Sequence, residues 1–322
     1  MLDWGKVWIV KAGKPPECAV PVRGGSKPSV VLHPIKPHGE KFFGMDSSRD
    51  YQRIGGDWLL GGKVVTDENV LARLHGLSAP SGWREVHVSF DPNAKLQVLG
   101  FDTKGRVNRR YLAAFDKEQA EVKFARVRQF SHDLVPARAI IDSDAVAGKA
   151  EALLTRLEDK TAIRIGTNKD LLAKQKAYGL TTLEGRHVSV QGTSISLDFI
   201  GKEGKQYTNT IQDGQLANWL AERKSIAGDA GRLFPDVNAA KLNNYVKETI
   251  GPYSIKDFRT YHATRIALNE LKPYQNVAMD AAKKKEVIKS TLDKVSTFLN
   301  NSPAMARKSY IDPTAWGLIG GI

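Results

Sequence analysis

The spacing of apolar residues predicts helices in the second half of the chain. Val146, Ala150, Leu153 and Leu157 recur at the three- and four-residue intervals that place side chains on one face of an α-helix. Asp142 and Ser143 precede this stripe and suit a helix N-cap, so we expect helical structure to begin near Ser143. The chain is predicted to be helical again from Gln215 on. A further apolar stripe has the helical period near the C-terminus: Ile288, Leu292, Val295 and Leu299.

Alternation of apolar and polar residues predicts strands in two other regions. Residues 86–90 alternate, and residues 96–99 follow an Asp-Pro-Asn turn. Residues 188–199 also alternate. The turn Gly201–Gly204 then precedes Gln206–Thr208, which predicts a β-hairpin.

These elements predict an α+β protein. Residues 46–130 are expected to form a small β-rich N-terminal domain, and residues 131–322 a larger, mainly α-helical domain that carries a small β-sheet. Residues 1–45 are rich in Gly, Pro and Lys and contain short apolar runs. We interpret them as an extension, and the sequence assigns them no role.

Composition adds a polyanionic partner to this picture. The 322 residues carry a formal net charge of +13, with a pI near 9.6. Such a balance favours nucleic acid first and an anionic membrane surface second, although some basic proteins have neither partner. No stretch approaches the roughly 20 apolar residues of a membrane span, and the N-terminus lacks the pattern of a secretory signal. Cys18 is the single cysteine, which excludes an intrachain disulfide and a multi-cysteine zinc site. We expect an intracellular, DNA-associated protein.

Arginines, one lysine and one tyrosine suffice for cleavage of a DNA strand without a metal or another cofactor. Negative charge grows on the non-bridging phosphate oxygens in the transition state, and fixed guanidinium groups stabilise it. The reaction also needs an in-line nucleophile and an acid that protonates the leaving 5′ oxygen. Several segments supply these residue types in one order: Leu77–Pro80 with Trp83–Val86, Gly100–Arg106, Ile163–Gly166 with Tyr178–Leu183 and Arg186–Val188, Phe199–Lys202, Lys256–Tyr261, and Ser302–Tyr310.

In this order and spacing, the segments resemble the motifs of type IB DNA topoisomerases of the poxvirus and bacterial kind. The resemblance covers about residues 58–314 and implies a clamp around DNA. It implies that Tyr310 attacks phosphorus, leaving a 3′-phosphotyrosyl bond and a free 5′ hydroxyl, and that religation needs no ATP. It further implies that Arg164, Arg259 and Lys256 face the scissile phosphate and that Lys202 is the acid. Each residue alone also fits an ordinary structural role, such as a helix-end charge or a packing aromatic.

One position departs from this family. A histidine usually stands nine residues before the tyrosine, where this chain has Asn301. The Asn301 amide still donates an N–H to a phosphate oxygen but carries no positive charge. We therefore include Asn301 in the catalytic set and expect weaker transition-state stabilisation, by ~1–2 kcal/mol.

A basic turn in the first domain resembles the family's DNA-contacting turn. Its cations and one aromatic lie within a few residues: Lys104, Arg106, Arg109, Arg110 and Tyr111. Such a turn is either a solvated hairpin or a grip on DNA phosphates, which holds DNA without reading its bases. The resemblance favours binding to DNA phosphates. It also implies that the partner is double-stranded DNA and that the protein binds it as a monomer.

Two other functions compete with this interpretation. Tyrosine recombinases share the arginines, lysine and tyrosine, but they usually carry a histidine three residues before the second arginine, where this chain has Lys256. A catalytically weakened DNA-binding relative is the other alternative, and Asn301 is the feature that favours it.

Overall fold

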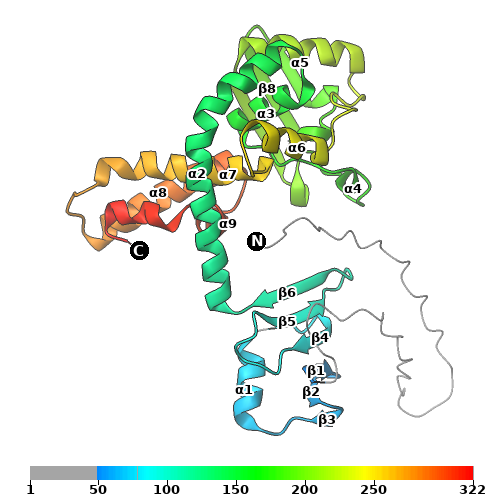
Figure 1. The fold of residues 1–322 in the computed structure, drawn as a ribbon, viewed down its shortest axis with the longest axis vertical. Coiled ribbons are helices and arrows are strands. Elements are labelled where there is room, and N and C mark those ends of the chain that lie inside the picture. Colours follow the sequence, from blue (N-terminus) through cyan, green and yellow to red (C-terminus); the bar gives the residue numbers. More distant parts are fainter. Residues whose placement is uncertain (1–48, 78, 322) are drawn as a thin grey trace, which may run out of the picture. The chain divides into compact units, whose positions relative to one another are not determined.

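The computed structural model describes residues 49–77 and 79–321, so the predicted extension of residues 1–45 lies outside the described residues. The chain divides into two compact units, one up to Arg110 and one from Tyr111 on. We call them the N-terminal and C-terminal units. The predicted α+β class is confirmed, with a small sheet-based unit and a larger helical one (Figure 1).

An antiparallel sheet forms the N-terminal unit, in the order β3-β2-β1-β4-β5-β6. Its strands are β1 (Tyr51–Ile54), β2 (Asp57–Leu60), β3 (Lys63–Val64), β4 (Arg84–Val88), β5 (Leu96–Phe101) and β6 (Val107–Tyr111). The strands predicted from residues 86–90 and 96–99 are confirmed as β4 and β5. Helix α1 (Glu68–Gly76) contributes the fully buried Leu74 to a core that includes Trp58 and Val98.

The C-terminal unit begins with a long helix that the sequence analysis misplaced. Helix α2 spans Ala113–Val146, so the expectation that helical structure begins near Ser143 was wrong. The domain boundary expected after residue 130 falls inside this helix. Val146 and Ala150 belong to different helices, and Val146 is 74% exposed. Helix α2 nevertheless has a buried stripe at helical spacing: Phe124, Val127, Phe130, Leu134, Ala137, Ile141 and Ala145. Apolar residues on the exposed face of the same helix, among them Val122, Val135 and Ile140, blur the helical period of this stripe in the sequence.

Shorter helices complete the C-terminal unit. They are α3 (Ala150–Thr161), α4 (Asn168–Leu171), α5 (Gly214–Ala227), α6 (Ala239–Thr249), α7 (Ile255–Leu271), α8 (Ala281–Leu299) and α9 (Pro303–Ser309). The helices predicted from Gln215 on and over residues 288–299 are confirmed as α5 and α8.

The predicted hairpin is confirmed in a three-stranded antiparallel sheet, β7 (Val188–Gln191), β8 (Ser194–Ile200) and β9 (Gln206–Gln212). The amide of Gly201 donates to the carbonyl of Lys205 at 2.8 Å and closes the β8–β9 turn. Helix α5 contacts β7 and β8, and α3 contacts β9 (Figure 1). The hairpin thus presents its turn from a well-packed base.

Two apolar cores adjoin α7. The first contains Phe258, which packs edge-on against Phe130 of α2 with ring centroids 4.9 Å apart. The second lies among α7, α8 and the C-terminal segment, and it contains Ala263 and Tyr310. Arg259 follows Phe258 on α7, so its side chain begins between the two cores.

Candidate active site

Arg259 is the most deeply buried of the predicted site residues, with 4% of its surface exposed. Its Nη1 donates to the carbonyl of Ala162, and its Nη2 donates to the carbonyl of Leu299 at 2.9 Å. Ala162 follows the last turn of α3, and Leu299 ends α8. One guanidinium therefore satisfies carbonyls at two helix ends that a helix leaves without partners of its own.

Both of these helix ends turn sharply, and each turn leads into a predicted site residue. Ala162 and Asn300 cap α3 and α8 in the left-handed conformation, each with φ of 48°. Residues other than glycine adopt this conformation at a cost, and such positions cluster at functional sites. Arg164 and Asn301 follow the two caps, and Arg164 Nη2 donates to Asn301 Oδ1 at 3.0 Å.

Tyr310 is held from three sides. Lys123 of α2 donates from Nζ to the Ser309 carbonyl at 2.9 Å, and Thr264 of α7 donates from Oγ1 to the Tyr310 carbonyl at 3.2 Å. The guanidinium carbon of Arg259 lies 5.3 Å from the Tyr310 ring centroid. Only 7% of Tyr310 is exposed. Backbone and ring are thus fixed before any substrate arrives.

Two guanidinium groups favour the ionised form of Tyr310. Burial raises the pKa of the Tyr310 phenol, but the charges of Arg259 and Arg164, together with contributions from the Arg259 and Asn301 side chains, outweigh burial. The net pKa lies below the ordinary value of 10.0 because a nearby positive charge stabilises the phenolate. An ionised phenol is the stronger nucleophile.

The predicted catalytic residues surround one cavity of about 280 Å³ in the C-terminal unit. Its lining includes Arg164, Lys202, Lys256, Arg259 and Tyr310. Lys202 and Lys256 are exposed, the first on the β8–β9 turn and the second in the first turn of α7. Asn301 joins this set through its hydrogen bond to Arg164. The structure therefore brings together all the residues predicted as catalytic, and Lys256 with them.

Two further residues of this site escaped the sequence analysis. Glu158 of α3 lines the same cavity and is fully buried, and Lys123 holds the residue before Tyr310. Glu158 had a local signal, since an acid four residues after Leu154 lies on the apolar face of its helix. Lys123 had none, because its partner lies 186 residues away along the chain.

Comparison with known families identifies the family of the chain. A family model described as the catalytic core of eukaryotic DNA topoisomerase I matches residues 112–314, more than half of the chain. A second, described as the N-terminal domain of bacterial DNA topoisomerase IB, matches residues 60–102. The chain belongs to the type IB DNA topoisomerase family. The predicted family resemblance is thereby confirmed.

Individual relatives carry topoisomerase names. DNA topoisomerase 1B of Acanthamoeba polyphaga mimivirus is 27% identical over 269 residues, which cover 77% of this chain and 79% of the viral protein. DNA topoisomerase 1 alpha of Arabidopsis thaliana is 28% identical over 158 residues, which cover 48% of this chain and 17% of the plant protein. The similarity to the viral type IB protein thus extends over most of both chains, whereas the plant similarity is confined to a segment.

The basic turn of this type IB chain is built by one carboxylate. Asp102 Oδ1 accepts the backbone N–H groups of Lys104 and Arg106, both at 2.9 Å, and Asp102 Oδ2 accepts Arg106 Nε at 2.7 Å. These bonds lower the Asp102 pKa to about 2, led by the backbone bond from Arg106. Lys104 is exposed, whereas Arg106 is engaged in holding the turn. Arg109 and Tyr111 follow on β6, where alternation places them on one face.

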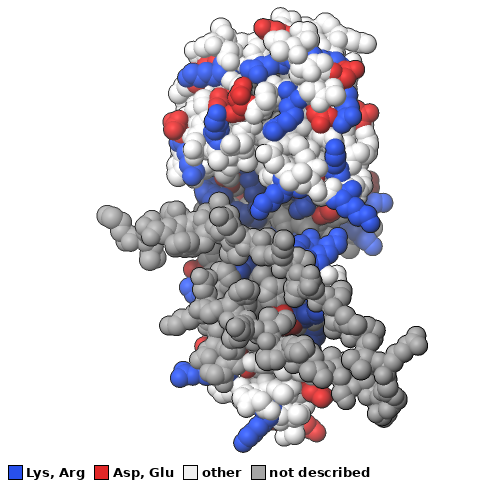
Figure 2. Space-filling model, turned by 90° about the vertical axis from the view of Figure 1, so that its right-hand side faces the viewer, with Lys and Arg blue, Asp and Glu red and all other residues white. Residues whose placement is uncertain are grey.

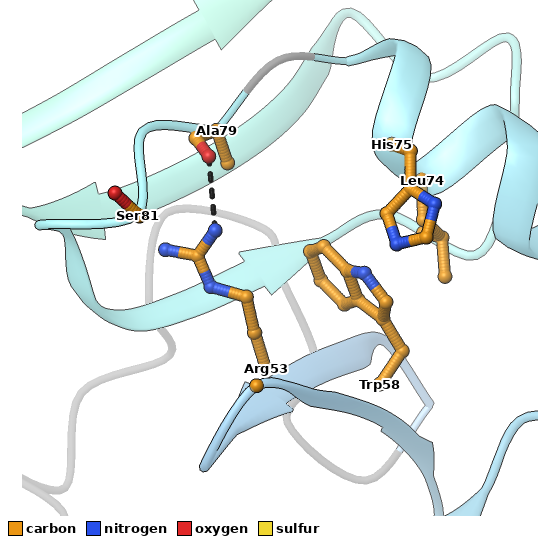
Figure 3. Close-up of a pocket in the computed structure, with 7 residues that line it drawn as sticks. Arg53, Trp58, Leu74, His75, Ala79 and Ser81 are labelled. Carbon is orange, nitrogen blue, oxygen red and sulfur yellow. Dashed lines mark hydrogen bonds between the residues drawn. The ribbon is translucent and has the colours of Figure 1, made fainter.

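The N-terminal unit also contains a cavity of about 340 Å³ (Figure 3). Arg53 points into it beside Trp58 and donates to the carbonyls of Ala79 at 2.9 Å, Pro80 at 2.6 Å and Trp83 at 3.1 Å. The Arg53 guanidinium donates hydrogen bonds to three carbonyls, so Arg53 holds the loop before β4 in place.

Positive charge is unevenly distributed over the C-terminal unit. In the face seen in Figure 2, Lys and Arg side chains gather along the lower edge of this unit, while both signs mix above. Among residues 49–77 and 79–321, no group of three or more His, Cys, Asp or Glu is arranged to hold a metal ion. No helix in that part of the chain has the length and apolar character to cross a membrane.

The charges around Tyr310 predict the direction in which its pKa responds to mutation. Arg164→Met removes a positive charge that favours the phenolate, so the pKa of Tyr310 should rise. Tyrosine labelled with ¹³C at Cζ reports ionisation by NMR, and Tyr310→Phe identifies the resonance. Arg186→Met, which removes a charge beside Glu184 instead, should leave the Tyr310 pKa unchanged. An unchanged or lower pKa in Arg164→Met would show that Arg164 does not act on Tyr310.

Proposed function

We propose that this type IB topoisomerase relaxes supercoiled double-stranded DNA by cleaving and resealing one strand through Tyr310, without ATP or a metal ion. The observation that carries the proposal is the placement of Tyr310 beside Arg259 and Arg164, at a cavity that Lys202 and Lys256 also line. Few other reactions require a tyrosine nucleophile, paired guanidinium groups and a lysine acid together.

Each group has one task in the cleavage step. Tyr310 gives up its proton to solvent water and attacks as the phenolate. Its oxygen forms a bond to phosphorus while the bond from phosphorus to the 5′ oxygen breaks. Arg164 and Arg259 stabilise the negative charge that grows on the non-bridging oxygens. Lys202 donates a proton to the leaving 5′ oxygen. Lys256 binds a phosphate from the exposed side of the cavity.

Religation is the reverse of this step. The 5′ hydroxyl attacks the phosphorus of the 3′-phosphotyrosyl group and gives its proton back to Lys202. The bond from phosphorus to the Tyr310 oxygen breaks, and Tyr310 leaves as the phenolate. One phosphoester bond replaces another in each direction, so no external energy source is required. The free strand rotates between the two steps and removes supercoils of either sign.

Asn301 has two roles in this scheme. Its Oδ1 accepts Arg164 and thereby orients that guanidinium. Its Nδ2 is buried and makes no hydrogen bond of ordinary geometry in the described part of the chain, while the same side chain favours the Tyr310 phenolate. It therefore lies where it can donate to a phosphate oxygen next to Tyr310. The asparagine therefore supplies a neutral donor at the position where the resemblance to the family leads one to expect a histidine.

One copy of the chain suffices for the reaction, because the C-terminal unit supplies Arg164, Lys202, Arg259, Asn301 and Tyr310. The N-terminal unit adds affinity through Lys104 and Arg109 as the second half of a clamp, and Tyr111 adds a contact where the C-terminal unit begins. Binding through phosphates is independent of base sequence. Because DNA is the proposed substrate, we expect the protein to be located on DNA inside cells or virions.

Relaxation should proceed in EDTA and without ATP. The purified chain should remove positive and negative supercoils from plasmid DNA, as gel electrophoresis would report. Tyr310→Phe retains the ring but lacks the attacking oxygen, so its relaxation should fall to background. The matched control is Tyr274→Phe, a tyrosine of the same unit outside the cavity, which should remain active. A requirement for magnesium or ATP would refute the proposal, as would full activity of Tyr310→Phe.

Lys104→Glu should weaken binding to duplexes of unrelated sequence equally. Removing one phosphate contact should reduce the slope of log affinity against log salt by about 1. Lys104 is preferable to Arg106 because Arg106 holds the turn through Asp102. Lys63→Glu is the control, since β3 lies at the opposite edge of the sheet from β6. Equilibrium binding to two duplexes tests this, and a loss confined to one sequence would mean that the turn reads bases.

A further inference from the structure

A buried acid lies at the proposed active site with nothing bonded to it. Glu158 has 0% of its surface exposed, and neither of its carboxylate oxygens accepts a hydrogen bond within the described structure. It nevertheless lines the cavity that Arg259 and Tyr310 also line. Unpartnered buried carboxyl groups are costly and rare, and where they occur they call for a functional reason.

Arg259 is the natural partner of Glu158 but is bonded elsewhere. Its Nη1 and Nη2 are engaged by the carbonyls of Ala162 and Leu299, while its Nε is buried and has no acceptor within the described residues. The site therefore holds an unused acid and an unused N–H of a catalytic guanidinium at the same cavity.

Burial, rather than the surrounding charge, favours the neutral form of Glu158. Burial raises the pKa of Glu158 well above its ordinary value, and Asp159 on the same helix raises it further, whereas Arg259 on α7 lowers it. Burial likewise lowers the pKa of Arg259, as does the charge of Arg164, which follows α3. Burial thus outweighs the attraction between the two groups in its effect on each pKa.

The remaining neighbours do not change this balance. Tyr207 on β9 donates to the Thr161 carbonyl at 3.1 Å, and burial raises its pKa to about 12, so it is neutral at physiological pH. The exposed Lys202 on the β8–β9 turn and Lys256 on α7 also line the cavity, as does Tyr310 after α9. Solvent screens the two lysines more than it screens the buried Arg259.

We propose that Glu158 is a positioning residue for strand cleavage: neutral, it leaves the charge of Arg259 for the scissile phosphate, and ionised, it withdraws that charge. This inference rests on the proposed cleavage reaction. No atom of Glu158 bonds to the substrate. Its ionisation places a negative charge beside the guanidinium that stabilises both the Tyr310 phenolate and the phosphate oxygens. Cleavage therefore slows as Glu158 loses its proton, although rising pH also ionises Tyr310.

Single-turnover cleavage from pH 6 to pH 9.5 tests the inference. The wild-type rate should rise as Tyr310 ionises and then fall as Glu158 ionises. Glu158→Gln is neutral at every pH, so its rate should lack the falling limb. The variant should match wild type at pH 6 and exceed it by ~10-fold at the alkaline end, about the effect of one charge-assisted contact. Glu151→Gln on the same helix is the control and should retain the wild-type profile.

Unfolding by urea tests the same group without DNA. The folded state raises the pKa of Glu158 above its value in the unfolded chain. The neutral form of Glu158 therefore stabilises the fold in full at pH values below the pKa that Glu158 has in the unfolded chain. This contribution is lost as the pH rises through the pKa that Glu158 has in the folded chain. The urea midpoint of wild type should therefore fall faster with pH than that of Glu158→Gln. Glu158→Met removes the unpartnered oxygens and should unfold at higher urea than wild type above neutral pH.

The outcomes separate this inference from the function on which it rests. Identical pH–rate profiles for wild type and Glu158→Gln would overturn the role of Glu158 and leave the topoisomerase mechanism intact. Parallel urea midpoints across pH would overturn it as well. Absence of any covalent cleavage by wild type would overturn the proposed function, and the role of Glu158 with it.

Discussion

The buried guanidinium of Arg259 is the interaction on which the proposed active site depends. It joins the end of α3 to the end of α8 through two carbonyls, and its charge lies over the ring of Tyr310. Hydrogen bonds from a charged donor contribute about 1.5–3 kcal/mol each, which helps to offset the cost of burying the charge. Loss of Arg259 would therefore release both segments that carry Arg164 and Asn301, in addition to removing a cation.

Among the described residues, three of the five non-glycine residues with positive φ angles lie next to this network, whereas Glu85 and Asn276 lie elsewhere. Ala162, Glu203 and Asn300 adopt positive φ angles without being glycine. Each is within two residues of a proposed catalytic residue, namely Arg164, Lys202 and Asn301. Such conformations cost about 1–2 kcal/mol and persist where the surrounding packing over-determines them. The bonds of Arg259 and the β8–β9 hairpin provide that packing, so stability elsewhere in the fold maintains the geometry of the site.

The sequence predicted those features that depend on local patterns. Alternation and turn residues located β4, β5 and the β8–β9 hairpin, and motif order indicated the residues that meet at the cavity. Helix α2 was missed because apolar residues on its exposed face, such as Val122 and Val135, blur the period of its buried stripe. Lys123 was missed because its bond to Ser309 depends on the packing of distant segments, which no local pattern encodes. Glu158 was visible as an acid on an apolar face, but its proximity to Arg259 required the fold.

We infer that this buried cluster makes Tyr310 the residue that receives the DNA strand. The covalent complex can be trapped with denaturant, its DNA and protein digested, and the remaining nucleotide located by mass spectrometry. We expect a 3′-linked nucleotide on the peptide that contains Tyr310, in the wild-type chain and in the absence of metal. A nucleotide on another residue, or one attached through its 5′ end, would contradict it.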